Sequence, residues 1–290
     1  MLPDFTLLRP QTVPDACALL AEHAGEAAAY AGGTELLLAM KLGEAAPRYL
    51  VDLKGVRGLD RLDVHDGALR VGALVTHRRL ELSPLVAGVL PALATLERQL
   101  ANPRIRATGT VGGNLASGRP HSDLATFLIA AGATVSCVSS AGTTRTVPAA
   151  DLTTAPFRTV LAEDEVIVAV DVPVPPAGTA LAHQRFILVE RPAATVTVRL
   201  AAAGGVVTEA RVVAGAASPI PRALPAAVGA LTGLPLDAGP ERLWPAGEAA
   251  AETMDVAPGG DEAYQRQLVA VLVRRAARAA LTDLAVASPA

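Results

Sequence analysis

Two glycine turns stand far apart in this chain, and each has the residues needed to hold a phosphate. The first is Ala-Gly-Gly-Thr at Ala31 to Thr34, and the second is Thr-Val-Gly-Gly-Asn at Thr110 to Asn114. Because glycine lacks a Cβ atom, such turns can take positive φ, expose their N–H groups in a concave nest and approach an anion closely. The first turn leads into a helix-like segment, Glu35 to Lys41, whose N-terminus would favour negative charge. We therefore predict that the two loops hold a diphosphate, and that it belongs to a dinucleotide.

The segments around the first turn predict a βαβ unit. A helical pattern begins at Pro14, a short apolar strand covers Ala27 to Ala31, and another strand covers Tyr49 to Asp52. Two strands joined by a helix in this way are normally parallel. A Rossmann domain has the same order, but its third glycine is missing after Gly33, and no P-loop sequence occurs. Asp52 is therefore expected to be a strand-end residue and not a ribose ligand.

The rest of the chain predicts a second domain. Before the proline cluster at 173–176, we expect helices at 84–100 and 121–131 and strands at 69–74, 134–138 and 166–172. After that cluster, three strands near 184–189, 195–202 and 206–215 precede helices near 223–231, 240–251 and 262–284. Strands followed by helices are typical of a separate α+β domain. We place the domains at residues 1–175 and 176–290.

Composition limits the class of protein. The chain has 290 residues, of which 51% are hydrophobic and 18% charged, and its net charge is −3. It should therefore bury a substantial core, and it has no basic stripe that would bind nucleic acid. No apolar run approaches the roughly 20 residues of a membrane span, and the start lacks a basic signal-peptide region. We expect a cytoplasmic protein without a transmembrane segment.

Cysteine and histidine usage predicts no metal site and no catalytic residue. Cys17 falls in the first helical pattern and Cys137 in a strand pattern, so both are expected to be buried. The five histidines stand singly, without metal-ligand spacing. His121 could be an acid or base, but a lone loop histidine is more often solvated.

Taken together, the two turns and their flanking residues carry a family resemblance. They include Tyr30 to Leu37, Met40-Lys41, Thr110 to Ala116, and the spacing from Asn114 through Pro120 to Asp123. Over nearly its whole length the chain resembles the FAD-binding subunits or domains of molybdenum hydroxylases, which include xanthine dehydrogenase and aerobic carbon monoxide dehydrogenase. The resemblance implies an α+β fold: a PCMH-type FAD-binding domain, made of a small α/β subdomain and a mixed-sheet subdomain, and then a C-terminal antiparallel sheet with helices.

The resemblance also implies which residues bind the cofactor. The first turn would bind the FAD diphosphate through backbone amides and the Thr34 hydroxyl, and the second would close over the diphosphate and ribityl region. Asp123 would accept a hydrogen bond from the cofactor, and Ile167 would line its pocket. Arg185 stands where the family usually has lysine. Arginine keeps the positive charge but changes the geometry of the donors. The full set is Tyr30, Ala31, Gly32, Gly33, Thr34, Glu35, Leu36, Thr110, Val111, Gly112, Gly113, Asn114, Asp123, Ile167 and Arg185.

Each assignment has a simpler structural alternative. The first glycine pair could be only a tight strand–helix turn, and Asn114 could be a left-handed turn residue. Asp123 could simply cap the helix that follows it. Arg191 could be an interface residue or have no role.

By resemblance, the chain is an electron-transfer subunit. Electrons would leave the substrate at a molybdenum cofactor in a large subunit, pass through two [2Fe-2S] clusters in a small subunit and reduce this FAD, which would pass them to NAD, a quinone or oxygen. Two such heterotrimers would pair. Gly-Gly-Thr-Glu in the first loop is closer to purine, aldehyde and N-heterocycle enzymes than to carbon monoxide dehydrogenases. Two other functions stay open: a self-sufficient FAD-dependent oxidoreductase and a non-catalytic accessory protein of the same fold.

Overall fold

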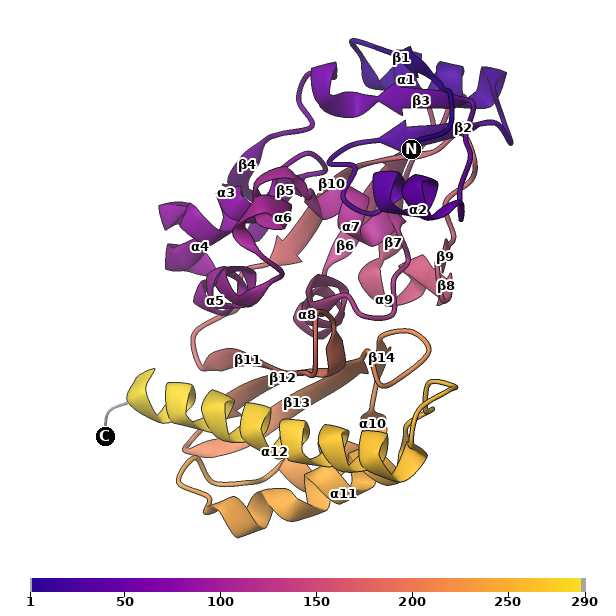
Figure 1. Ribbon diagram of the computed structural model, residues 1–290. Helices are drawn as coiled ribbons and strands as arrows, with labels where there is room; N and C mark the ends of the chain where they lie inside the picture. Colours follow the sequence, from indigo (N-terminus) through magenta and orange to yellow (C-terminus); the bar gives the residue numbers. More distant parts are fainter. Residues whose placement is uncertain (1, 288–290) are drawn as a thin grey trace.

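A small parallel sheet forms the N-terminal end of the computed structural model, which describes residues 2–287 (Figure 1). Its strand order is β1-β3-β2, and both strand pairs are parallel. Helix α1 packs against the sheet, and its Cys17 is buried in that contact. The parallel βαβ unit predicted from the sequence is confirmed. The elements are β1 (Thr6–Leu8), α1 (Val13–Glu22), β2 (Ala27–Tyr30), α2 (Leu36–Leu42), β3 (Tyr49–Asp52) and the 3-10 turn η1 (Leu53–Gly55).

A five-stranded sheet follows, with the order β4-β5-β10-β6-β7. All four strand pairs are antiparallel, whereas the family resemblance implies a mixed sheet. A short hairpin, β8 and β9, lies at its side and follows the one-turn helix α9. The bounds are β4 (Leu62–His65), β5 (Ala68–Gly72), β6 (Thr134–Val138), β7 (Thr144–Pro148), α9 (Ala149–Leu152), β8 (Thr153–Ala155), β9 (Arg158–Thr159) and β10 (Val166–Pro173).

Helices cover this second sheet. The single helix predicted for 84–100 is wrong, because the chain breaks at Leu90, whose φ is −147°. Pro91 explains the break, since proline disfavours helical geometry in the residue before it. Asn102 caps another short helix that the sequence predicted only as a connecting segment. The helices are α3 (His77–Leu82), α4 (Pro84–Val89), α5 (Pro91–Gln99), α6 (Pro103–Thr108), α7 (Val111–Ala116) and α8 (Asp123–Ala131).

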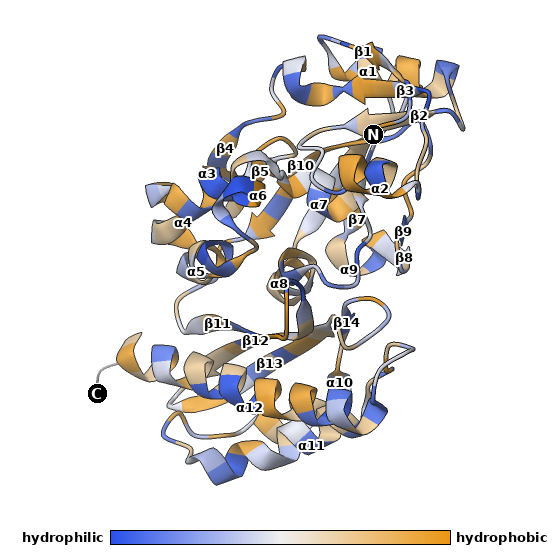
Figure 2. Cartoon of the chain, viewed as in Figure 1, coloured by the Kyte–Doolittle hydropathy of each residue, from blue (hydrophilic) through white to orange (hydrophobic). Residues whose placement is uncertain are grey.

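The C-terminal part is an antiparallel sheet with the order β11-β12-β13-β14. Strands precede helices here, as predicted, and α12 lies across the sheet with α11 beside it (Figure 1). Figure 2 shows both hydrophobic and hydrophilic residues around α12, as expected for a helix with one buried face. The elements are β11 (Thr179–Ile187), β12 (Pro192–Ala203), β13 (Val206–Gly215), β14 (Arg222–Ala223), α10 (Pro225–Leu231), η2 (Pro240–Leu243), α11 (Trp244–Thr253) and α12 (Glu262–Ala287).

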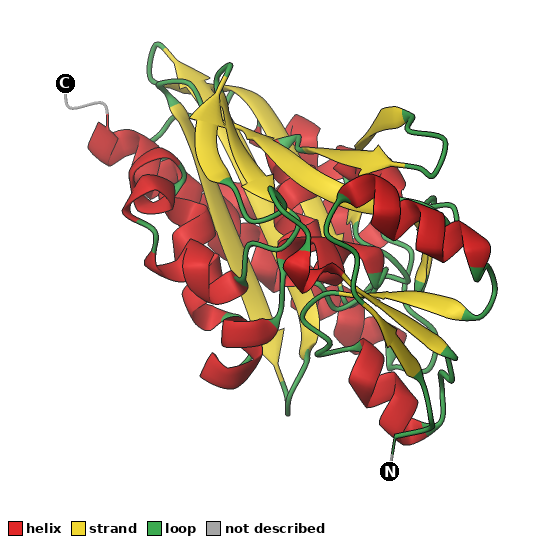
Figure 3. Ribbon diagram, turned by 90° about the horizontal axis from the view of Figure 1, so that it is seen from above, coloured by secondary structure: helices red, strands yellow, loops and turns green. Residues whose placement is uncertain are grey.

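Helix α8 joins the two parts of the molecule. Every residue of α8 is buried, because it packs against the second sheet and against β12 and β13 of the C-terminal sheet. The Oγ1 atoms of Thr126 and Thr195 are hydrogen-bonded at 3.0 Å across this contact. The N-terminal strand and the end of α12 lie at opposite ends of the molecule (Figures 1 and 3). Among the described helices, none is long and apolar enough to cross a membrane.

Candidate cofactor site

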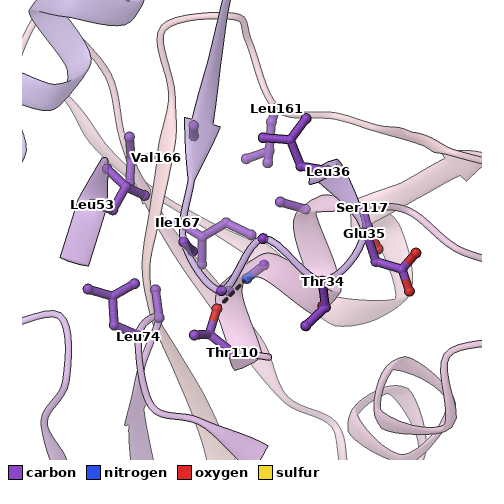
Figure 4. A pocket seen from close by; sticks show the side chains of 18 of the residues that line it. Thr34, Glu35, Leu36, Leu53, Leu74, Thr110, Ser117, Leu161, Val166 and Ile167 are labelled. Carbon is purple, nitrogen blue, oxygen red and sulfur yellow. Dashed lines mark hydrogen bonds between the residues drawn. The ribbon is translucent and has the colours of Figure 1, made fainter. Parts of the chain in front are cut away.

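A cleft runs past both glycine turns and consists of two adjoining cavities. The first has a volume of about 320 Å³ and lies between α2, α7 and the start of β10 (Figure 4). The second has a volume of about 530 Å³ and lies between α3, the α7–α8 loop and the β11–β12 loop. The residues common to both cavities are Thr34, Glu35, Thr110, Ser117 and Arg119. The two cavities therefore meet beside the first glycine turn.

The first turn forms the nest that the sequence predicts. Within residues 2–287, no protein acceptor is hydrogen-bonded to the backbone N–H groups of 32–35, and these four residues line the first cavity. Gly33 has a φ of 74°, in the left-handed region that favours glycine. A Cβ on Gly32 would lie 2.1 Å from the carbonyl oxygen of Thr108, so the turn packs directly on the chain before α7. Four unpaired N–H groups at the start of α2 can bind an anion.

The second turn is built differently, and the prediction that it exposes its amides is wrong. The amides of Val111 and Gly112 donate to the carbonyls of Val75 and Ala73, at 3.0 and 2.8 Å. The amide of Gly113 donates to Thr110 Oγ1 at 3.1 Å, as Figure 4 shows, so Thr110 caps α7. Neither Gly112 nor Gly113 has a positive φ.

Close packing explains the glycine at position 112 instead. A Cβ on Gly112 would lie 2.6 Å from the Cβ of Ala73, so only glycine lets α7 pack against the segment after β5. The second turn therefore forms a wall of the cleft, and its backbone amides are used in holding that wall in place.

The structure brings most of the predicted site residues to this cleft. Tyr30 and Val111 do not line it. The Tyr30 ring lies under the first turn, with its Cε2 atom 2.5 Å from where a Cβ of Gly33 would be, and Val111 is buried in the core. The first cavity is lined by Ala31, Gly32, Gly33, Leu36, Gly112, Gly113 and Ile167; the second by Asn114, Asp123 and Arg185; and both by Thr34, Glu35 and Thr110.

Asp123 is held by two basic side chains. Its Oδ1 atom is 3.1 Å from Nε2 of His183, and its Oδ2 atom is 3.0 Å from Nη1 of Arg185. It is not the helix cap, because the cap is Ser122, whose Oγ accepts from the amide of Ala125 at 3.0 Å. Sequence reasoning missed His183, since sixty residues separate it from Asp123 and no local pattern predicts that contact.

Arg185 offers an unused donor. Its Nη1 atom also donates to the carbonyl of Gln99 at 2.7 Å, which fixes the guanidinium at the wall of the second cavity. Its Nε atom is buried and has no acceptor in the described part of the chain. A buried donor without a partner is costly, and a ligand acceptor such as a ring carbonyl would satisfy it.

A buried histidine–glutamate pair supports the second turn. His77 Nδ1 and Glu97 Oε2 are 3.0 Å apart, and burial raises the pKa of Glu97 above its usual range. The backbone N–H of His77 donates to the carbonyl of Gly109 at 3.1 Å, which ties α3 to the residue before the second turn. His121 has a similar connecting role, because its Nδ1 lies 3.1 Å from the carbonyl oxygen of Pro192 and burial lowers its pKa.

Glu165 is a further lining residue that the sequence analysis missed. Its carboxylate accepts two hydrogen bonds from Arg145, at 2.6 and 2.7 Å, and these lower its pKa. A lowered pKa means that the pair stabilises the fold above the unfolded-state pKa, and that this stability is lost as the pH falls through the folded-state value.

We expect Glu165→Gln to lower the free energy of unfolding by about 1–3 kcal/mol at pH 7. In urea unfolding curves, the difference in the free energy of unfolding between this variant and wild type should become smaller below about pH 4. An equal cost at pH 7 and pH 3 would contradict this assignment.

Fold and cleft together define a two-domain α+β protein with an anion-binding turn between two joined cavities. A family model for the FAD binding domain in molybdopterin dehydrogenase matches residues 3–175, and one for the CO dehydrogenase flavoprotein C-terminal domain matches residues 191–280. The chain therefore belongs to the family of FAD-binding medium subunits of molybdenum hydroxylases. The recognition made from the glycine turns is confirmed.

Individual relatives agree with this assignment. The nicotine 6-hydroxylase medium subunit of Paenarthrobacter nicotinovorans is 34% identical over 276 residues, which cover 94% of this chain and 96% of that protein. A solved carbon monoxide dehydrogenase from Hydrogenophaga pseudoflava superposes with a TM-score of 0.92 at 31% identity, covering 97% of this chain and 99% of that one. Quinoline 2-oxidoreductase from Pseudomonas putida 86 gives a TM-score of 0.91 at 27% identity, covering 98% and 99%. The chain is thus a flavin subunit of a molybdenum-dependent dehydrogenase or hydroxylase.

Proposed function

We propose that this chain binds FAD without a covalent bond in the two-cavity cleft and transfers electrons through it. The electrons would come from [2Fe-2S] clusters in a small partner subunit, after oxidation of a substrate at a molybdenum cofactor in a large subunit. The electrons would then pass from this chain to an external acceptor. Bound FAD would supply the redox chemistry, and the chain would supply binding, orientation and electrostatics.

The observation that carries this proposal is the row of unpaired N–H groups at 32–35. These groups fit a diphosphate, since a dinucleotide has its diphosphate in the middle and a cavity lies on each side of the turn. The first cavity has apolar walls from Leu53, Leu74 and Ile167, which suit an adenine (Figure 4). The second contains Arg185 with its unpaired Nε, which suits the polar edge of a flavin ring. The predicted roles of Asn114 and Asp123 in cofactor binding remain part of this proposal.

An exposed apolar tip beside the second cavity fits the proposed assembly. Ile187, Leu188 and Val189 are 41%, 64% and 88% exposed, and they lie at the end of β11 and in the loop that follows it. Apolar side chains gathered on a surface commonly mark a protein interface. We propose a heterotrimer with the small and large subunits, paired into a dimer of heterotrimers. The cytoplasmic location expected from the sequence stays a prediction.

Cofactor release tests the proposal. We expect heat or acid precipitation of the purified protein, alone or with its copurifying subunits, to release about one flavin per chain into the supernatant. Phosphodiesterase should convert that flavin to FMN, which identifies it as FAD. Flavin that stays with the precipitate, or FMN as the released species, would contradict the proposal. Protein with no flavin and no affinity for added FAD would favour the accessory-protein alternative.

A further inference from the structure

An acidic side chain lies where the proposed site needs positive charge. Glu35 directly follows the first glycine turn and lines both cavities. Its carboxylate would repel a diphosphate with two negative charges unless a cation lay between them. Two arginines from distant segments lie against it: Arg119 in the α7–α8 loop, and Arg191 in the β11–β12 loop at 3.6 Å.

Arg119 is the better placed of the two. It lines both cavities, whereas Arg191 lines only the second. Its side chain is 17% exposed, against 40% for Arg191. Among the described residues that line both cavities, Arg119 is the only one with a cationic side chain. It therefore lies at the junction of the two cavities, where its ion pair with Glu35 holds it next to the first glycine turn.

The backbone around Arg119 is built to hold it there. Gly118 has a φ of 56°, and its carbonyl accepts from the amide of Phe157 at 2.8 Å. Phe157 itself has a φ of 61°, which is uncommon for a bulky residue and indicates a constrained turn. The guanidinium carbon of Arg119 lies 5.2 Å from the centroid of the Phe157 ring, so the two side chains make a cation–π contact. The guanidinium thus contacts an aromatic ring as well as the Glu35 carboxylate.

We infer that Arg119 is a ligand of the FAD diphosphate and that Glu35 positions its guanidinium for this contact. The inference deepens the proposed function and rests on it. A guanidinium presents several N–H donors in a rigid plane, so it can contact a carboxylate and a phosphate at the same time. The backbone nest and Arg119 would then bind the diphosphate together.

Paired substitutions separate phosphate recognition from a structural ion pair. Arg119→Gln should weaken FAD and ADP binding by about tenfold to a hundredfold, because it removes a charge-assisted hydrogen bond. Glu35→Gln keeps a side-chain oxygen that can accept from Arg119 and removes the negative charge beside the diphosphate, so it should weaken FAD binding much less than Arg119→Gln does. A merely structural pair would instead lose affinity equally when either partner is changed.

Arg199→Gln is the matched control. Arg199 has the same 17% side-chain exposure and pairs with Glu209 at 2.7 Å, on the C-terminal sheet and away from both cavities. It should leave FAD affinity unchanged. Arg119→Lys should recover part of the affinity, since the charge returns without the planar donors.

The titrations use the full chain, alone or in its deflavinated complex, with FAD and ADP at low and high salt. Arg119→Gln should also make FAD affinity less dependent on salt. Equal weakening by Arg119→Gln and Glu35→Gln, or unchanged FAD affinity in Arg119→Gln, would overturn the inference and leave the proposed function intact. A wild-type chain that binds neither FAD nor ADP would overturn both.

Discussion

Gly32→Ala should purify without flavin and should not regain it when FAD is added. The added Cβ would lie 2.1 Å from the Thr108 carbonyl oxygen and 2.8 Å from its carbon, and both are backbone atoms that no side-chain rotation can move. The turn would have to shift away from the chain before α7. The unpaired N–H groups of 32–35 would then lose the arrangement that fits a diphosphate. The measurement is flavin absorbance per chain after gel filtration with excess FAD.

Two controls separate this effect from general destabilisation. Gly88→Ala makes the same chemical change in α4, where a Cβ would meet nothing within 4 Å, and it should keep full FAD occupancy. It should also add about 0.5–1 kcal/mol of stability, since alanine favours a helix. Asp52→Ala removes a carboxylate that pairs with Lys54 at 2.7 Å. Because Asp52 lines neither cavity, this variant should retain FAD. Full occupancy in Gly32→Ala together with loss in Asp52→Ala would instead support a Rossmann-like site.

Reduction of the flavin by an organic substrate should require the large subunit. We expect at least one compound from a panel of a purine, an aldehyde, an N-heterocycle and carbon monoxide to bleach the flavin absorbance of the complex. None should bleach the FAD-loaded chain by itself, although dithionite should. The reason lies in the donor groups available to the chain. It has two cysteines, both buried in separate elements, whereas a [2Fe-2S] cluster takes four protein ligands.

The described residues also contain no group of three or more metal-ligating side chains. Under the proposed function, we expect the chain to accept electrons from a partner and not from the substrate. Stopped-flow spectra of the complex and of the isolated chain, recorded with the same compounds, make the comparison. Rapid bleaching of the isolated chain by a panel compound would support the self-sufficient oxidoreductase and remove the electron-transfer proposal.

Short-range features of this protein could be predicted from its sequence. The alternation of strand, Gly-Gly turn, helix and strand between Ala27 and Asp52 predicted a parallel βαβ unit, which the structure contains. Turn chemistry and hydrophobic periodicity act over a few residues, so the order of residues largely determines them. The two turns together were also specific enough to identify the family.

Contacts between distant segments could not be predicted in this way. The amides of Val111 and Gly112 are used by the segment after β5, and no pattern near the second turn indicates that they would be. Asp123 meets His183 and Arg185 only because α8 lies against the C-terminal sheet.

Arg119 shows the same division most clearly. Its sequence position between Asn114 and Asp123 placed it near the predicted site, but its charge had no assigned partner there. Glu35 and Phe157 reach it from segments 84 and 38 residues away, through folding of the chain around the cleft. The sequence by itself determined the local turns, the βαβ unit and the family. Only the tertiary structure decided which amides stay unpaired and which charges meet in the cleft, because hydrogen bonding and charge pairing between distant segments depend on the packing of whole elements.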